Sequence, residues 1–279
     1  MAALTLLRSR KLIAPFAVHA PTTVENALQL KATISDARFM AGGIELADQL
    51  KNGISYSDLI RLDAIPELNS ISLQNGHLHI GAATPHRLVS QHPLIRRHLP
   101  SFADAVASIG SPRIRTQGTI GGNLMTGAWH YDMLPMLMAL SARVTLATAD
   151  SVRHEHPIEA VMSSQPSDLL VSIIIPVGDK SSDFWFQRVD KPVQSLSVAR
   201  SIGNADSFSF SVVLACTSHQ PILRTVRSGA ESNPEEQVKI WRESLVELRD
   251  DHTSSAWYRA ELAEIRLRRM LSQAMGGRP

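Results

Sequence analysis

Two pairs of neighbouring glycines, Gly42-Gly43 and Gly121-Gly122, do most to limit how this chain can fold. The first pair ends a short extended run at 38–41 and precedes a helical pattern at 46–50, and the second lies ahead of an apolar helical run. Because glycine has no Cβ, the backbone N–H groups of such a turn can converge on one point, and the start of the next helix adds a partial positive charge. Two such turns could hold the two phosphates of one dinucleotide, although plain tight turns explain an isolated glycine pair about as well.

The familiar catalytic and nucleotide-binding signatures are absent from the sequence. Neither glycine turn is a G-x-G-x-x-G or a G-x-x-x-x-G-K motif, and the chain has no G-x-S-x-G, H-E-x-x-H or C-x-x-C. The single cysteine, Cys216, lies in an apolar strand pattern, which predicts a buried thiol and excludes both an internal disulfide and an iron–sulfur cluster held by this chain alone. We therefore expect no catalytic residue and no metal site here, so any redox chemistry would belong to a bound cofactor.

Composition excludes several classes of protein. The chain has 279 residues, enough for one or two domains, and its 28 Lys and Arg nearly balance its 26 Asp and Glu, which argues against a nucleic-acid partner. The longest apolar stretches, 133–142 and 169–177, each contain proline and are shorter than the roughly 20 residues that cross a bilayer. The start of the chain does not resemble a signal peptide. We expect a soluble, cytoplasmic protein without a membrane span.

Hydrophobic periodicity and turn residues predict a mixture of helices and strands. Helices are expected at 23–33, 46–50, 99–109, 133–140, 235–248 and 254–274, and strands at 38–41, 143–148, 169–175, 184–189, 195–200 and 208–216. Thr22 and Thr23 have the character of a cap at the start of the first helix. Asn75-Gly76 between two alternating runs predicts a tight hairpin. The polar stretch 177–183 is the best candidate for a domain boundary.

Two pairs of histidines and the face of the last helix complete these local predictions. His77 and His79 are expected to face solvent from one side of a strand, and His154 and His156 to lie in a polar turn; no third ligand accompanies either pair, so we expect no metal. The last helix is expected to carry Tyr258, Leu262 and Ile265 on one face, and to pair Glu264 with Arg268.

An ordered set of motifs gives the chain its family resemblance. The motifs are Ala41-Gly42-Gly43-x-Glu45-Leu46, the glycine-rich stretch from Ile109 to Asn123, Asp132-Met-Leu-Pro135, Leu170 to Pro176, and Ser255 to Arg259. Together they resemble the FAD-binding medium subunit of molybdenum hydroxylases, the xanthine and carbon monoxide dehydrogenase family, over essentially the whole chain. The resemblance implies an α+β fold. A two-lobed FAD-binding domain of the PCMH type, like that of vanillyl-alcohol oxidase, would occupy residues 1–178, with lobes of about 1–60 and 61–178. A small α/β domain of the CO dehydrogenase flavoprotein C-terminal type would occupy 179–279.

The resemblance also implies where FAD is held. Residues 41–46 and 119–123 would cradle the diphosphate, with Ile109 nearby; Asp132 would bond polar parts of the flavin, and Leu170 would line the adenine or ring pocket. Arg188 stands where the family often has a lysine, and keeps a positive charge that can stabilise reduced flavin. The cofactor-binding set implied in this way is Ala41, Gly42, Gly43, Ile44, Glu45, Leu46, Ile109, Thr119, Ile120, Gly121, Gly122, Asn123, Asp132, Leu170 and Arg188.

The chain departs from the family pattern at two places. Ile44 stands where Thr, Ser or His is usual, which removes a side-chain donor to phosphate but leaves the backbone donors. Trp129, His130 and Tyr131 stand where a stretch of small residues is typical. Their rings could stack on the isoalloxazine, block it, or simply pack in the core or an interface.

By resemblance, the chain is the FAD-binding electron-transfer subunit of a heterotrimeric hydroxylase or dehydrogenase, assembled as a dimer of heterotrimers. An N-heterocycle, purine or aldehyde would be oxidised at molybdopterin on a large subunit, and [2Fe-2S] clusters on a small subunit would pass electrons to FAD and on to an external acceptor. Two alternatives remain: a stand-alone flavin oxidase of the same fold, which would need its own substrate pocket and general base, and a structural subunit whose flavin site has decayed.

Overall fold

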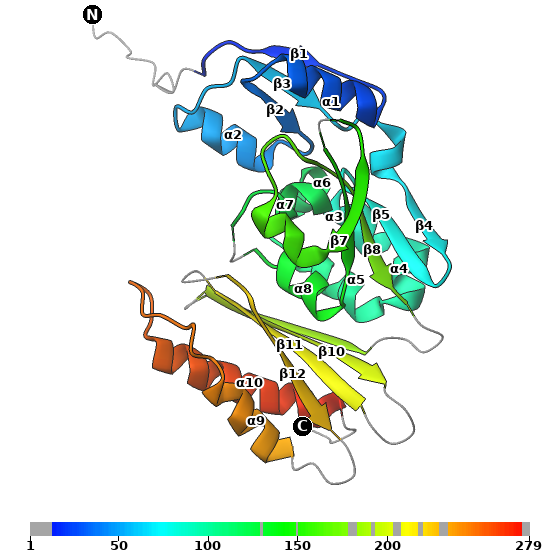
Figure 1. The fold of residues 1–279 in the computed structure, drawn as a ribbon. Coiled ribbons are helices and arrows are strands. Elements are labelled where there is room, and N and C mark those ends of the chain that lie inside the picture. Colours follow the sequence, from blue (N-terminus) through cyan, green and yellow to red (C-terminus); the bar gives the residue numbers. More distant parts are fainter. Residues whose placement is uncertain are drawn as a thin grey trace, which may run out of the picture.

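Three β-sheets, each built by its own stretch of the chain, organise the molecule (Figure 1). The computed structural model describes residues 13–128, 131–148, 150–177, 183–190, 193–202, 208–216, 220–228 and 234–274. Residues 129 and 130 of the unusual aromatic stretch, and residues 178–182 of the expected domain boundary, lie outside these ranges.

The first sheet is parallel and small. Its strand order is β1 (Ala17–His19), β3 (Asp58–Arg61) and β2 (Ala37–Met40), connected through α1 (Val24–Thr33) and α2 (Ile44–Lys51). Parallel neighbours need such crossover helices. The side chain of Thr23 caps α1 by accepting the backbone N–H of Asn26 at 3.2 Å, as the Thr-rich helix start predicts.

The second sheet is antiparallel, and the stretch of chain that builds it also forms several short helices. Its strand order is β4 (Ile71–Gln74), β5 (His77–Gly81), β8 (Leu169–Pro176), β6 (Arg143–Ala147) and β7 (Arg153–Pro157). The predicted hairpin is present, because Asn75 and Gly76 have φ of 48° and 72°, the left-handed values that a type I′ turn requires. The helices of this lobe are α3 (His86–Gln91), α4 (Pro93–His98), α5 (Pro100–Ala107), α6 (Pro112–Gln117), α7 (Ile120–Leu124) and α8 (Met133–Ala139), with 3-10 turns η1 (Pro66–Asn69) and η2 (Ile158–Ser163).

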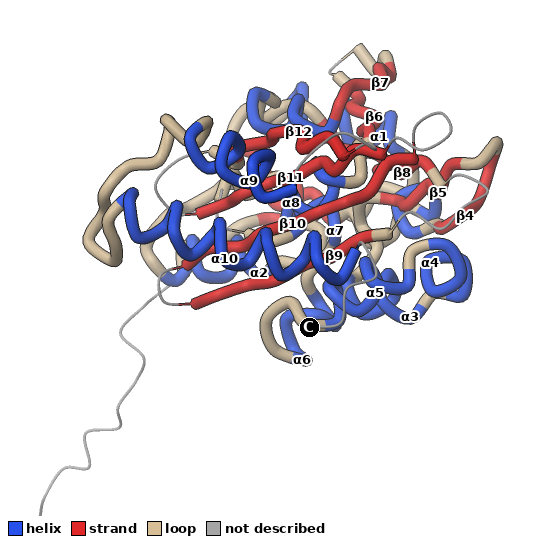
Figure 2. Tube along the Cα trace, turned by 90° about the horizontal axis from the view of Figure 1, so that it is seen from below, coloured by secondary structure: helices blue, strands red, loops and turns tan. Residues whose placement is uncertain are grey.

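The C-terminal sheet is an antiparallel meander covered on both faces. The strands β9 (Phe184–Asp190), β10 (Val193–Ile202), β11 (Phe208–Cys216) and β12 (Ile222–Ser228) follow one another in space, with α9 (Pro234–Glu243) and α10 (Ala256–Ala274) across one face (Figure 2). The other face packs against α8 and α5, where the rings of Phe102 and Phe184 meet edge to face at 6.1 Å. The α+β fold class is therefore confirmed, with the finer point that this C-terminal sheet is antiparallel throughout.

The face of the last helix that carries Tyr258 and Ile265 is not its buried face. Tyr258 and Ile265 are 48% and 47% exposed, whereas Arg259, one residue along, is fully buried. Its guanidinium bonds the carboxylate of Asp251 at 2.7 Å and the backbone oxygen of Val193 at 3.2 Å. A buried arginine is tolerated here because its charge is paired.

The second histidine pair also lies elsewhere than predicted. His154 and His156 belong to strand β7 at the sheet edge and not to a turn, and His77 and His79 on β5 are half-buried rather than fully solvent-facing. Within the described ranges no three side chains of His, Cys, Asp or Glu come together as a metal site would need. The helices described include none with the length and apolar content needed to span a bilayer.

Candidate functional site

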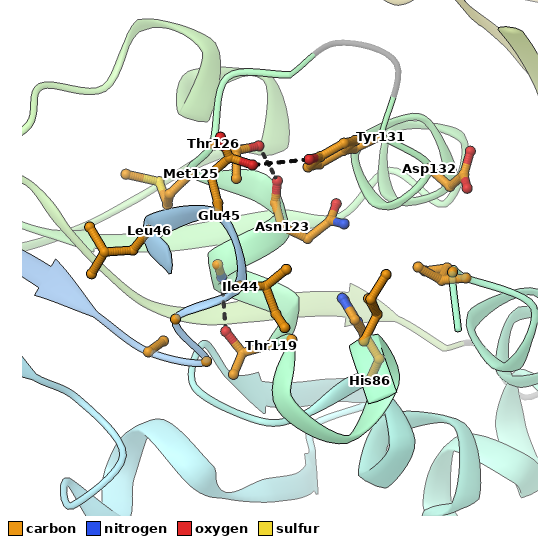
Figure 3. A pocket seen from close by; sticks show the side chains of 18 of the residues that line it. Ile44, Glu45, Leu46, His86, Thr119, Asn123, Met125, Thr126, Tyr131 and Asp132 are labelled. Carbon is orange, nitrogen blue, oxygen red and sulfur yellow. Dashed lines mark hydrogen bonds between the residues drawn. The ribbon is translucent and has the colours of Figure 1, made fainter. Parts of the chain in front are cut away.

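A cavity of about 530 Å³ lies where the two lobes and the C-terminal sheet meet (Figure 3). The turn between β2 and α2 forms one wall, the α5–α7 region a second, and the residues before α8 together with β9 close it. Twelve of the fifteen residues predicted to bind a cofactor line this cavity: Ala41, Gly42, Gly43, Ile44, Glu45, Leu46, Ile109, Thr119, Gly122, Asn123, Asp132 and Arg188. The fold thus gathers residues that the sequence separates by up to 147 positions (188 − 41).

The first glycine turn packs directly against the second lobe. A Cβ on Gly42 would lie 1.8 Å from the carbonyl oxygen of Gln117, so only glycine permits this close approach. Gly43 follows with φ of +70° and begins α2 without any side-chain cap. The first N–H groups of a helix have no partner within it, so residues 44–46 bring backbone donors to the cavity wall.

The second glycine turn is built differently from the first. All four backbone N–H groups of residues 120–123 are already bonded inside the protein, at 2.8–3.0 Å, to Thr84 O, Ala82 O, Thr119 Oγ1 and Thr119 O. This turn therefore brings side chains to the cavity: Figure 3 shows Asn123, whose buried Oδ1 has no hydrogen-bond partner among the described residues. The expectation of two equivalent amide-lined turns is not met, because α7 is itself held by these bonds.

The three remaining predicted residues lie outside the main cavity. Ile120 is fully buried in the core of the second lobe. Gly121 lets α7 pack closely, since a Cβ there would lie 2.6 Å from that of Ala82. Gly121 and Leu170 line a second cavity of about 190 Å³, which shares five wall residues with the first: Arg38, Phe39, Ala41, Gly122 and Met125.

An ion pair between a half-buried arginine and a buried aspartate joins the C-terminal sheet to the cavity. Nη1 of Arg188 on β9 lies 2.7 Å from Oδ1 of Asp132, the 6% exposed residue at the start of α8, and its Nε lies 2.9 Å from Asp190. Burial opposes the guanidinium charge, but the two carboxylates outweigh it and raise the pKa of Arg188. Two residues that were predicted separately as flavin contacts therefore hold each other in position.

A second long-range bond crosses the cavity between the lobes. The Tyr131 hydroxyl donates to Oε2 of Glu45 at 3.2 Å, joining the residue before Asp132 to the first turn of α2 (Figure 3). Burial raises the pKa of Tyr131, and the charges of Glu45 and Asp48 raise it further, so the phenol keeps its proton at neutral pH. Of the three aromatic residues singled out in the sequence, Tyr131 is the one the structure places, and it lies at the cavity wall.

Sequence reasoning missed His86, which begins α3 and also lines the cavity. Its side chain is 1% exposed, and burial lowers its pKa to about 4, so the ring is neutral at pH 7. No sequence signal could have found it, because a single histidine after a proline matches no motif.

Comparison with known proteins shows which family this architecture belongs to. Residues 14–178 match the family described as the FAD binding domain in molybdopterin dehydrogenase. The chain belongs to this family. The resemblance stated from the motifs is thereby confirmed, as is FAD as the cofactor of the domain.

Individual members of the family resemble the chain to different extents. It is 28% identical over 273 residues to the nicotine 6-hydroxylase medium subunit of Paenarthrobacter nicotinovorans, covering 91% of this chain and 95% of that one. It is 33% identical over 141 residues to the nicotinate dehydrogenase FAD-subunit of Eubacterium barkeri, and spans about half the length of that and several other curated relatives. A solved structure of carbon monoxide dehydrogenase from Hydrogenophaga pseudoflava shares the fold, with a TM-score of 0.81, 22% identity, and coverage of 92% and 96% of the two chains.

The residues of the cavity fit a flavin dinucleotide. Gly42 leaves no side chain between the first turn and Gln117, α2 supplies uncapped N–H groups that suit a phosphate, and Asn123 Oδ1 and His86 Nδ1 have no partner within the described ranges. The side chains of Asn123 and His86 both line the cavity, so a polar ligand held there would lie beside them.

Proposed function

We propose that this chain is the FAD-binding electron-transfer subunit of a molybdenum hydroxylase complex, with FAD in the 530 Å³ cavity. The observation that carries the proposal is the apposition of Gly42 and Gln117, which brings the uncapped start of α2 to a cavity that the second glycine turn and Arg188 also line. When bound, FAD supplies the capacity to take up and release electrons one or two at a time.

The residues divide the cavity into two ends. The backbone of 41–46, with the side chains of Thr119 and Asn123, would hold the diphosphate, and Leu170 in the adjoining cavity would contact the adenine end. Ile109, Asp132 and Arg188 would surround the flavin ring. We divide the chain accordingly into a FAD-binding domain at 1–178 and a C-terminal domain at 179–279, which contributes Arg188 from β9.

The chain's own side chains would bind and orient, and would move no proton during turnover. Arg188 is fixed by carboxylates on two sides, so its positive charge would stand at a constant position beside the ring. Tyr131 and Glu45 would close the cavity between the lobes and limit the entry of water. Substrate oxidation would take place on a partner chain.

The complex that we propose follows the relatives in outline. The relatives include subunits named for nicotine, nicotinate, caffeine and xanthine. All four are N-heterocycles, and caffeine and xanthine are purines, which supports an N-heterocycle, purines included, over an aldehyde as substrate of the large molybdopterin subunit. A small subunit with [2Fe-2S] clusters would deliver electrons to FAD, in a cytoplasmic dimer of heterotrimers.

The test is a measurement of cofactor content and affinity. We expect the purified chain, alone and co-expressed with its companion subunits, to take up one FAD with a visible flavin spectrum, and iron and molybdenum to appear only in the co-purified complex. A chain that stays colourless beside its companions and shows no affinity for FAD would overturn the proposal and favour a structural subunit. Substrate turnover by the isolated chain with oxygen would favour a stand-alone oxidase instead.

A further inference from the structure

The ring of His86 makes no hydrogen bond to any residue in the part of the chain that the structure describes. The side chain is 1% exposed and lines the large cavity, and because Nδ1 is closed off from solvent, Nε2 on the ring edge facing Gly118 is the nitrogen that can meet a ligand. A buried polar ring without a partner destabilises the fold, since it has lost its bonds to water and gained none. Such a residue is explained if a ligand supplies a bond.

The position of His86 identifies which end of the cavity it serves. Its backbone N–H bonds the carbonyl of Gly118 at 2.9 Å, and a Cβ on Gly118 would lie 3.4 Å from its ring carbon Cδ2. Gly42 packs against Gln117 and Gly118, so the His86 ring and the first glycine turn lie on either side of Gly118. Figure 3 shows His86 on the side of the cavity near Thr119, with Tyr131 on the other side. His86 therefore lies at the glycine end and away from the bond that closes the cavity.

The chemistry of the ring narrows the choice of ligand group. A neutral imidazole carries one N–H donor, and at this end of the cavity the uncapped N–H groups of residues 44–46 already favour an anion. Arg38 adds a positive charge to the same cavity wall. An N–H among such neighbours is complementary to a phosphate oxygen.

We propose that His86 is a diphosphate-binding residue, whose neutral ring donates a hydrogen bond to a diphosphate oxygen of the bound dinucleotide. This inference rests on the proposed function. It adds a side-chain donor at the end of the cavity where Ile44 supplies none.

The experiment compares three probes on the full chain: FAD, ADP, which has the diphosphate but no flavin, and riboflavin, which has the ring but no phosphate. Their dissociation constants are measured for the wild type, His86→Leu and His86→Gln. We expect His86→Leu to weaken FAD and ADP about ten-fold and to leave riboflavin unchanged, and His86→Gln, which keeps an N–H donor, to recover part of the loss. The matched control is His92→Leu, because Nδ1 of His92 is also buried without a partner among the described residues but His92 lines neither cavity.

The outcomes separate the inference from the function on which it rests. A wild type that binds no FAD overturns the proposed function. A wild type that binds FAD, with His86→Leu binding FAD and ADP equally well or losing riboflavin to the same extent, overturns only the role of His86. If His86→Leu does not fold, the ring ¹⁵N resonances of His86 in the wild type decide: they shift on adding ADP if the bond forms, and an unchanged spectrum at saturating ADP overturns the inference.

Discussion

Replacing Gly42 by alanine tests whether the first glycine turn must touch the chain at Gln117 for the cofactor to bind. The new Cβ would lie 1.8 Å from the Gln117 oxygen, and Cβ atoms essentially never approach a neighbour within 3.0 Å, so the turn and Gln117 must separate by at least 1.2 Å (3.0 − 1.8). A hydrogen bond of about 2.9 Å stretched by that amount exceeds about 4 Å and is lost. Two lost bonds to a charged diphosphate, at about 1.5–3 kcal/mol each, weaken FAD binding by roughly 10²- to 10⁴-fold.

The assay is a fluorescence titration of the apoprotein with FAD, accompanied by urea unfolding. Overpacking at Gly42 is expected to lower the free energy of unfolding by about 1–3 kcal/mol as well. Gly53→Ala is the matched control. Gly53 has φ of +91°, a methyl group there would meet no atom within 4 Å, and the residue lies outside both cavities, so alanine adds backbone strain of about 1–2 kcal/mol without touching the site.

A specific result would contradict this role of Gly42. If Gly42→Ala binds FAD as tightly as Gly53→Ala and the wild type do, the contact between Gly42 and Gln117 does not position the diphosphate donors. A loss of affinity equal in the two variants would mean that general destabilisation, and not separation of the first glycine turn from Gln117, weakens binding.

Three further changes probe the bonds around the cavity. Tyr131→Phe removes the 3.2 Å bond to Glu45 and should speed FAD dissociation about five-fold, measured by stopped flow; an unchanged rate would argue against a closing role. Asp132→Asn removes the charge beside Arg188, whose side chain is 34% exposed, and should lower the free energy of unfolding by about 1–2 kcal/mol in urea; full stability would show that the pair contributes nothing. His86 has a folded pKa of about 4 against 6.5 when unfolded, so stability present above pH 6.5 should fall by up to about 3 kcal/mol as the pH drops to 4. Urea unfolding at about pH 7 and pH 4.5 should show a smaller fall for His86→Leu, and identical falls would contradict a buried neutral ring.

Local signals in the sequence predicted the elements that depend on local chemistry. The Asn75-Gly76 hairpin, the Thr23 cap and the 2.8 Å pair between Glu264 and Arg268 are all present. Each of these involves residues no more than a few positions apart, so turn geometry and helical spacing suffice to predict them.

Helices α4 and α6 and strand β12 escaped prediction, whereas α5 matches the helix expected at 99–109. Prolines stand at the first position of α4, α5 and α6, where a missing N–H costs nothing, and they divide the region into helices of six to eight residues. Periodicity read over longer windows cannot separate elements of that length. Strand β12 was missed for a related reason: with charged residues at Arg224 and Arg227 it lacks the apolar pattern of a core strand.

The site itself was only partly predictable. Glycine positions located the turns, but whether an N–H is free depends on what lies opposite it, and Ala82 and Thr84 accept bonds from the second turn across the fold. The pairing of Arg188 with Asp132, 56 residues apart, depends likewise on how the C-terminal sheet docks on α8. Such long-range contacts leave no local trace in sequence.

The adjacency of Tyr131 and Asp132 has a mechanical consequence. One residue reaches Glu45 of the first lobe and the next reaches Arg188 of the C-terminal sheet, so a single planar peptide unit joins the two attachments. The first lobe and the last sheet are therefore linked to each other through two adjacent residues. If the dinucleotide exchanges through an opening between them, one of these two bonds must break first.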